Sequence, residues 1–286
     1  MDGLLIINKE KNMTSRDVVN KVCKLLNTKK IGHTGTLDPL ATGVLVLAVN
    51  KGLKIVEDIT SLDKEYVAEV TLGIETDTLD ITGNILKKEN VNVSEKEIDD
   101  VLKSFIGYYN MEVPLYSAKK INGKKLYEYA RNNEEVDLPI NKVYIYELER
   151  ISNLVLEDDL VKFFIRCKVS KGTYIRSLIR DISKRLNTLG VMSELKRTKQ
   201  GIFSIDNSYT LNDIENNNYR IIKIDEALIL PKIEVPKDYL NKVKNGNKID
   251  NIFKEEKFYF TINGEIIGIY EIDKENDSLL RPYKMF

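Results

Sequence analysis

The pattern of apolar and polar residues in the first quarter of the chain predicts a strand, a helix, a loop and two further strands. Residues 3–8 form a short apolar run of strand length. A helix capped by Ser15 follows, because apolar residues recur there at helical spacing. Its predicted apolar face consists of Val18, Val19, Val22, Leu25 and Leu26. Two more apolar runs, Val44–Val49 and Tyr66–Leu72, also have strand length.

The middle of the chain combines one clear helix signal with residues typical of strands. Ser94 and Glu97 have the spacing of a capping box before an apolar helix face. Residues 143–156 and 160–169 are rich in Val, Ile, Tyr and Phe and meet at Asp158-Asp159. This composition predicts a long antiparallel hairpin.

A second helix pattern runs from a Thr173 cap to Gly190 and places Arg176 in the first turn, next to the apolar face. Strands mixed with helices, without regular βαβ alternation, indicate an α+β fold around a largely antiparallel sheet. Two strands near the end, Lys257–Ile262 and Glu265–Ile272, meet at Asn263-Gly264. We therefore predict two domains, residues 1–232 and a small β-rich unit over residues 233–286.

Charge is balanced over the whole chain but segregated along it. The chain has 44 basic and 44 acidic residues, yet residues 162–201 hold eleven Lys or Arg against two acids. Residues 134–159 hold eight acids against two bases. A basic segment suits a polyanion, so this segregation favours a directed RNA-binding face.

The spacing of the cysteines and the lengths of the apolar runs argue against a zinc-binding, a disulfide-rich or a membrane-spanning protein. Cys23 and Cys167 lie far apart without Cys-x-x-Cys spacing, which indicates neither a zinc site nor a disulfide framework. The chain starts without a basic leader, and no apolar run is long enough to cross a bilayer. These features predict a cytoplasmic protein that does not bind membranes.

Residues 32–43, Gly-His-Thr-Gly-Thr-Leu-Asp-Pro-Leu-Ala-Thr-Gly, hold three glycines, the only histidine of the chain and one carboxylate. Glycine lets the backbone approach a ligand closely, and Pro39 stiffens the chain after Asp38. The loop could therefore hold a reactive carboxylate still. Taken alone, Asp-Pro and Gly-Thr-Gly are also common in ordinary turns.

Four further segments accompany this loop. They are Lys64-Glu65-Tyr66, Asp77-Thr78-x-Asp80-x-x-Gly83, Tyr116-Ser117-Ala118-Lys119-Lys120 and Lys171-Gly172-Thr173-Tyr174-Ile175-Arg176. These segments resemble, in the same order, the motifs of the bacterial tRNA pseudouridine synthase B family. The loop resembles the catalytic loop of that family through the string Gly-His-Thr-Gly-x-Leu-Asp-Pro-x-Ala-x-Gly-Val-Leu. The resemblance covers most of residues 1–200.

The resemblance implies a pseudouridine synthase fold, with an RNA-binding insertion at about 108–140 and a C-terminal unit similar to a PUA RNA-binding domain. It implies an isomerase without a cofactor that flips out the uridine at tRNA position 55, in the T loop, and converts it to pseudouridine. The implied partner is the T arm of tRNA, bound by a monomer that requires no protein partner. Such an enzyme can also assist tRNA folding.

The resemblance assigns the catalytic roles to Asp38, Tyr66 and Arg176. Asp38 supplies an ionised carboxylate that acts at the sugar carbon or at the base, a choice that the sequence leaves open. Arg176 is expected to keep Asp38 charged through a bidentate pair. Tyr66 is expected to receive the flipped base and to relay a proton. The residues assigned to substrate binding are His33, Lys54, Asp80, Tyr116, Lys119, Tyr174 and Leu195.

A basic segment interleaved with tyrosines adds a predicted RNA grip. It comprises Lys119, Lys120, Lys124, Lys125 and Arg131 with Tyr116, Tyr127 and Tyr129. This pattern also occurs on solvated helices, but phosphate contact and base stacking use the same residue types. Its likeness to the RNA-gripping insertion of the family favours binding.

Three alternative functions remain open from the sequence. A metal-dependent hydrolase could use His33, Asp38, Asp77 and Asp80, but the ligand spacing is poor and we predict no metal site. A non-catalytic RNA-binding or RNA-folding protein would need the basic segments without the catalytic set. A guide-RNA-dependent synthase is the third alternative, and the basic segment favours stand-alone recognition of tRNA.

Overall fold

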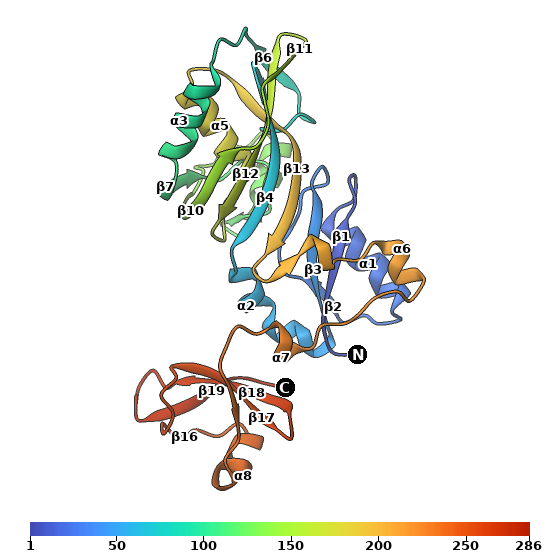
Figure 1. Cartoon of the computed structure of the whole chain (residues 1–286), viewed down its shortest axis with the longest axis vertical. Helices are drawn as coiled ribbons and strands as arrows, with labels where there is room; N and C mark the ends of the chain where they lie inside the picture. Colours follow the sequence, from blue (N-terminus) through green and yellow to red (C-terminus); the bar gives the residue numbers. More distant parts are fainter.

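The computed structural model describes all 286 residues and has a large twisted sheet as its centre (Figure 1). In spatial order its main strands are β1 (Gly3–Lys9), β3 (Thr42–Val49), β13 (Gly190–Gln200), β4 (Lys64–Leu72), β12 (Leu160–Val169), β10 (Ile140–Arg150) and β7 (Gly107–Glu112). The short strands β2 (Ile31–His33), β14 (Phe203–Ser204) and β11 (Val155–Glu157) pair with β3, β13 and β12. Only β3 and β13 pair in parallel, so the predicted α+β fold with a mixed, largely antiparallel sheet is confirmed.

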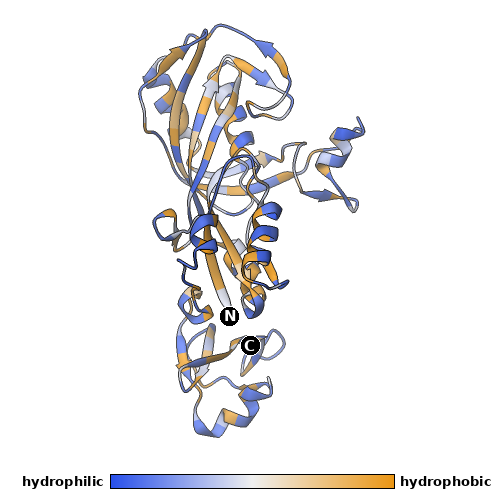
Figure 2. Cartoon of the chain, turned by 90° about the vertical axis from the view of Figure 1, so that its right-hand side faces the viewer, coloured by the Kyte–Doolittle hydropathy of each residue, from blue (hydrophilic) through white to orange (hydrophobic).

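Three longer helices, α1 (Ser15–Leu25), α3 (Glu95–Ser104) and α5 (Ile175–Arg185), pack on one face of this sheet. A core cluster of 35 buried residues lies between helices and strands and includes Val22, Leu102, Ile179 and Tyr66. Figure 2 shows the resulting apolar strands inside a more polar exterior. The shorter helices are α2 (Val56–Ser61), α4 (Leu126–Arg131), α6 (Leu211–Glu215), α7 (Ile224–Ala227) and α8 (Leu240–Lys244). No helix has the length and apolar character that crossing a bilayer requires.

The helix caps confirm one prediction and correct two. Ser94 and Glu97 form the predicted capping box of α3. The cap of α1 is Thr14 rather than Ser15, because the Thr14 hydroxyl accepts the Asp17 N–H while the Ser15 hydroxyl points into the core. Helix α5 begins at Ile175 without a side-chain cap, and the predicted cap residue Thr173 donates to the Ser170 carbonyl instead.

Part of the charge segregation along the chain is neutralised by cross-strand ion pairs. Strands β10 and β12 pair antiparallel, and β11 forms a hairpin with β12 through Asp158-Asp159. These pairings bring acidic residues of one segment beside basic residues of the other, as in the ion pairs Glu149–Arg166 and Glu157–Lys162. Two basic residues of the segment 162–201 are thus paired within the sheet, a pairing that distance along the sequence does not reveal, and the RNA-binding face stays a prediction.

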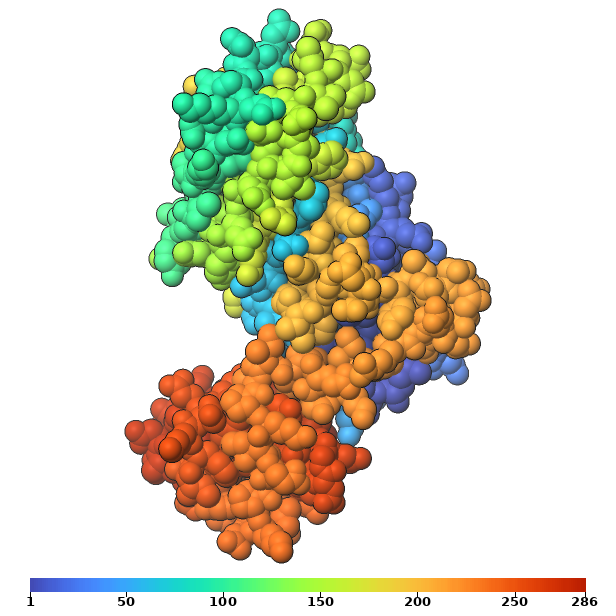
Figure 3. Space-filling model, in the orientation of Figure 1, coloured from blue at the N-terminus to red at the C-terminus, as the bar shows by residue number.

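The C-terminal residues form a second sheet with strand order β15-β17-β18-β19-β16. Its strands are β15 (Lys232–Glu234), β17 (Lys257–Ile262), β18 (Glu265–Ile272), β19 (Leu279–Met285) and β16 (Ile249–Asp250). The predicted strands and their Asn263-Gly264 turn are present. Figure 3 shows this unit at one end of the molecule. It contacts the body, because Tyr259 and Ile269 belong to a core cluster that also contains Ile55 and Ile59.

Candidate functional site

A cleft of about 540 Å³ lies between the loop that carries Asp38, strands β4 and β13, the start of α5 and the segment 116–119. Of the predicted site residues, those that line it are Asp38, Tyr66, Tyr116, Lys119, Tyr174, Leu195 and Arg176. Segments far apart in the sequence thus meet at one place. This convergence agrees with the set of motifs from which the site was predicted.

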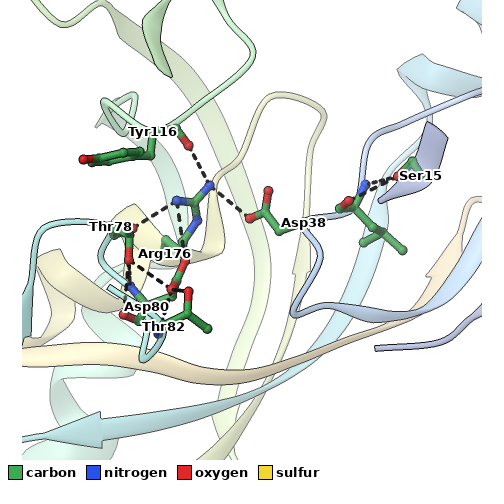
Figure 4. Close-up of polar contacts among 8 residues, drawn as sticks. Ser15, Asp38, Thr78, Asp80, Thr82, Tyr116 and Arg176 are labelled. Atoms are coloured by element: carbon green, nitrogen blue, oxygen red, sulfur yellow. Dashed lines mark hydrogen bonds and ion pairs between the residues drawn. The ribbon is translucent and has the colours of Figure 1, made fainter. Parts of the chain in front are cut away.

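The loop around Asp38 is held from the β1–α1 connection. The Ser15 hydroxyl accepts the Leu37 N–H at 2.8 Å and lies 3.2 Å from the Leu37 carbonyl, to which it can donate (Figure 4). The Pro39 carbonyl accepts the Asn12 N–H at 2.8 Å. The residues on both sides of Asp38 are therefore fixed, while its own side chain stays 38% exposed toward the cleft.

Arg176 is the buried cation that faces Asp38. Its Nη2 lies 3.0 Å from Asp38 Oδ2, and the side chain is only 7% exposed. The same guanidinium donates to the backbone carbonyls of Thr78 and Tyr116, both at 3.0 Å. Figure 4 shows Arg176 between these groups. The pair with Asp38 uses one nitrogen rather than the predicted bidentate fork, because Nη1 donates to the Thr78 carbonyl and lies near Asp80 instead.

Asp80 completes the surroundings of Arg176 from the far side. Its Oδ2 lies 3.8 Å from Arg176 Nη1, and its Oδ1 accepts from the Thr82 N–H and hydroxyl. Asp80 does not line the cleft, so in this structure it lies behind Arg176. Its backbone loop is tied to β13, because the Met192 N–H donates to Leu79 and the Met192 carbonyl accepts from Ile81.

Two of the tyrosines that line the cleft, Tyr66 and Tyr174, remain protonated at neutral pH. Burial raises the pKa of Tyr66, and Arg197 opposes this effect only in part. Burial likewise raises the pKa of Tyr174, which is half-buried. Each phenol can therefore donate a proton or a hydrogen bond to a bound group.

Three buried cations had no predicted role: Lys64 and Arg197, which line the cleft, and Lys9, which does not. Lys9, Lys64 and Arg197 are at most 8% exposed and donate to backbone carbonyls. Burial lowers the pKa of Lys9 and of Lys64 to about 8, so both are largely charged at neutral pH. Their charges create a positive environment for Asp38 and for RNA phosphates. Lys64 belongs to the Lys64-Glu65-Tyr66 segment quoted above, but nothing in the sequence indicated that Lys9 and Arg197 are buried, since lysine and arginine are usually exposed.

The predicted RNA grip forms an arm of two short strands, β8 (Lys120–Ile121) and β9 (Lys124–Lys125), followed by α4. It projects from the body in the view of Figure 2. Two of its lysines have partners within the arm, because Lys124 pairs with Glu134 and Lys125 donates to the Tyr127 hydroxyl. Lys119 and Lys120 are exposed.

Besides Asp80, two predicted substrate-binding residues lie outside the cleft lining. His33 lies on β2 with its Nδ1 buried and without a partner, and burial lowers its pKa. Lys54 lies in a 3-10 turn (Asn50–Ile55) and donates to the Met285 carbonyl of the C-terminal unit. In this structure Lys54 thus contacts the C-terminal unit and does not line the cleft, and its role in substrate binding stays a prediction. No group of three or more His, Cys, Asp and Glu side chains forms a candidate metal site.

The chain matches two family models that define its class. Residues 23–175 match the TruB family pseudouridylate synthase N-terminal domain, and residues 176–241 match the tRNA pseudouridylate synthase B C-terminal domain. The class is therefore that of the pseudouridylate synthases, which are isomerases.

Curated relatives narrow this class to one family. The chain is 40% identical over 290 residues to tRNA pseudouridine synthase B of Caldanaerobacter subterraneus, with 100% of this chain and 99% of the relative covered. It is 40% identical to the Bacillus cytotoxicus enzyme of the same name, covering 100% and 97%. The chain belongs to the tRNA pseudouridine synthase B family.

Solved structures show the same fold. One, titled as an H/ACA RNP bound to a substrate RNA containing 2'-deoxyuridine, has a TM-score of 0.72 at 23% identity and covers 99% of this chain and 84% of its own. Another, a Cbf5-Nop10-Gar1 complex, has a TM-score of 0.70 at 26% identity and covers 94% and 78%. The fold of the whole chain is thus a pseudouridine synthase fold.

Proposed function

We propose that this chain converts the uridine at position 55 in the T loop of tRNA to pseudouridine, as a stand-alone monomer in the cytoplasm. The observation that carries the proposal is the Asp38–Arg176 ion pair in a cleft that Tyr66 also lines. A protein that only binds RNA has no need for this set. The names of its relatives and the match of both family models support tRNA as the substrate.

The reaction breaks the N1–C1′ bond, turns the base and forms a C5–C1′ bond, with C5 losing a proton and N1 gaining one. Asp38 supplies the ionised carboxylate, either as the nucleophile or as the stabiliser of positive charge. Arg176 keeps that carboxylate charged and aimed into the cleft. Tyr66 stacks on the flipped base, and its protonated phenol is the proton relay near C5.

RNA binding is assigned to three further parts of the molecule. The arm at residues 116–131 contacts phosphates through Lys119 and Lys120, and His33 contacts the displaced nucleotide during base flipping. Tyr174, Leu195 and Tyr116 contact the flipped nucleotide in the cleft, with Asp80 supporting Arg176. Residues 233–286 act as a PUA-like RNA-binding domain, residues 1–232 as the catalytic domain, and the enzyme also assists tRNA folding.

The test mixes purified protein, without guide RNA or other protein, with an unmodified tRNA transcript and measures pseudouridine at each uridine. We expect conversion at position 55, and none in a transcript that has cytidine there. Excess chelator should leave the rate unchanged. Tight binding without conversion would favour the non-catalytic RNA-binding alternative, and conversion only with an added guide RNA would favour the guide-dependent one.

A further inference from the structure

Three tyrosines form an exposed ladder beside the cleft, on β7 and β10. The rings of Tyr108 and Tyr144 are 4.9 Å apart between centroids and meet edge to face, and those of Tyr144 and Tyr146 are 4.8 Å apart. Tyr108 is 77% exposed and Tyr146 40% exposed. We call Tyr108, Tyr144 and Tyr146 the tyrosine ladder.

The ladder lies on the face of the sheet opposite to the helices. Val143 and Ile145 point into the core with 2% and 0% exposure, and successive strand residues point to opposite faces. Tyr144 lies between them in the sequence and therefore faces outward, directly opposite Tyr108 in the strand register. The folded chain thus leaves aromatic surface in water without a partner in the molecule.

Lysines flank both ends of the ladder. Lys142 Nζ lies 4.9 Å from the centre of the Tyr108 ring, and Lys168 Nζ lies 5.7 Å from that of Tyr146. Two carboxylates are also near, because Asp63 contacts Tyr146 and Glu147 is opposite Lys168 in the register. Aromatic rings interleaved with lysines are the residue types that bind unpaired RNA bases and their phosphates.

The ladder is joined directly to the rim of the cleft. Ser170 and Gly172 line the cleft, and both are hydrogen-bonded to β10. The Tyr144 N–H donates to the Ser170 hydroxyl at 2.8 Å, and the Asn141 side-chain amide donates to the Gly172 carbonyl at 3.0 Å. Lys171, between them, is exposed. An RNA that occupies the cleft can therefore continue around this rim.

We propose that the tyrosine ladder is a second RNA-binding surface, which stacks unpaired bases of a folded tRNA outside the T arm. The proposal rests on the proposed function, since it takes tRNA as the substrate in the cleft. The cleft lies on the face of the sheet that carries the helices, because Tyr66 belongs to the core beneath them and Arg176 lies on α5. Under the proposal, a T-arm hairpin in the cleft stays on that face, and only the remainder of a complete tRNA contacts the ladder beyond the edge strand β7.

A purely structural role would have a different signature. A cross-strand aromatic pair stabilises an edge of a sheet, so removing Tyr108 would then lower the melting temperature without changing RNA affinity. A binding role changes affinity in a protein whose melting temperature is nearly unchanged. Tyr108→Phe retains the ring and should retain binding under our proposal.

The experiment measures the dissociation constants of full-length tRNA and of its isolated T-arm hairpin for Tyr108→Ala, Tyr146→Ala and the double variant. For the double variant we expect affinity for full-length tRNA to fall about tenfold or more, as when a base loses its stacking partner. Affinity for the hairpin should stay within about twofold. Leu156→Ala is the matched control, because Leu156 is 72% exposed on β11 of the same sheet.

Pseudouridine formation in the hairpin by the wild-type protein tests the proposed function separately from the ladder. If the hairpin is converted but the double variant binds full-length tRNA as tightly as wild type, the ladder is not an RNA-binding surface. An equal loss of affinity for both RNAs would overturn the assignment to RNA outside the T arm. Lys142→Gln should also reduce the slope of log affinity against log salt by about one for full-length tRNA.

Discussion

Replacing Asp38 by Asn removes the negative charge in the cleft while keeping the size of the side chain. Either mechanism at Asp38 depends on that charge, so turnover at saturating tRNA should fall at least about a thousandfold, which is about 4 kcal/mol of transition-state stabilisation. The fold should barely change. Arg176 is 7% exposed and Asp38 is 38% exposed, and a pair open to water on one side stabilises by about 1 kcal/mol. The melting temperature should fall by about 2 °C.

The assay is single-turnover pseudouridine formation with enzyme in excess over an unmodified tRNA, together with RNA binding and a thermal melt. Asp77→Asn is the matched control, because Asp77 carries the same group one residue before Thr78, whose carbonyl binds Arg176, but its carboxylate accepts only from Asn84. We expect the control to retain most activity and Asp38→Asn to bind tRNA without converting it. Near wild-type turnover in folded, RNA-bound Asp38→Asn would refute the reasoning and redirect attention to Asp80.

Three further predictions concern stability. Gly43→Ala should lower the free energy of unfolding, measured in denaturant, by about 3 kcal/mol or more, because the φ of Gly43 is +96° and a Cβ would lie 2.2 Å from the Arg197 carbonyl oxygen. The control is Gly264→Ala, which should cost about 1 kcal/mol, because Gly264 has a φ of +79° and no atoms near the added Cβ. Lys64 has its pKa lowered from 10.5 to about 8. Between these values the unfolded chain binds more protons, so Lys64 should add about 2 kcal/mol to the free energy of unfolding from pH 7.5 to 9.5. Lys9, whose pKa is also lowered to about 8, adds a similar amount, so Lys64→Met should lose only the share of Lys64. Deleting residues 233–286 should lower the melting temperature of the remaining body, because Tyr259 and Ile269 would no longer cover its apolar surface; an unchanged melt would show that the two parts are independent.

Local signals predicted most of the elements, since strand and helix patterns depend on neighbouring residues. The capping box at Ser94 and the turn at Asn263-Gly264 are examples. The cap of α1 was misplaced by one residue because Thr14 and Ser15 are both good caps. Only the tertiary contact of Ser15 with Leu37 shows which of them is free for the helix.

The site was predictable only where a motif marked it. Asp38 and Arg176 are far apart in the sequence, and the resemblance, not their spacing, brought them together. Arg197 was missed because a fully buried arginine has no local signature: its Nε donates to the Val44 carbonyl, a partner on another strand. The exposure of Tyr108 likewise depends on which strand ends at the edge of the sheet.

Strand β13 hydrogen-bonds both loops of the site and so fixes the distance between them. The backbone of Met192 hydrogen-bonds Leu79 and Ile81, in the loop whose Thr78 carbonyl accepts from Arg176. The Arg197 side chain donates to the Gly35 carbonyl, in the loop that carries Asp38. The pairing of β13 with β4 shifts register next to both positions. A residue inserted or deleted between Met192 and Arg197 would therefore separate the carboxylate from the guanidinium, even though neither lies on this strand. The length of this segment is a stricter requirement than the identity of its exposed residues.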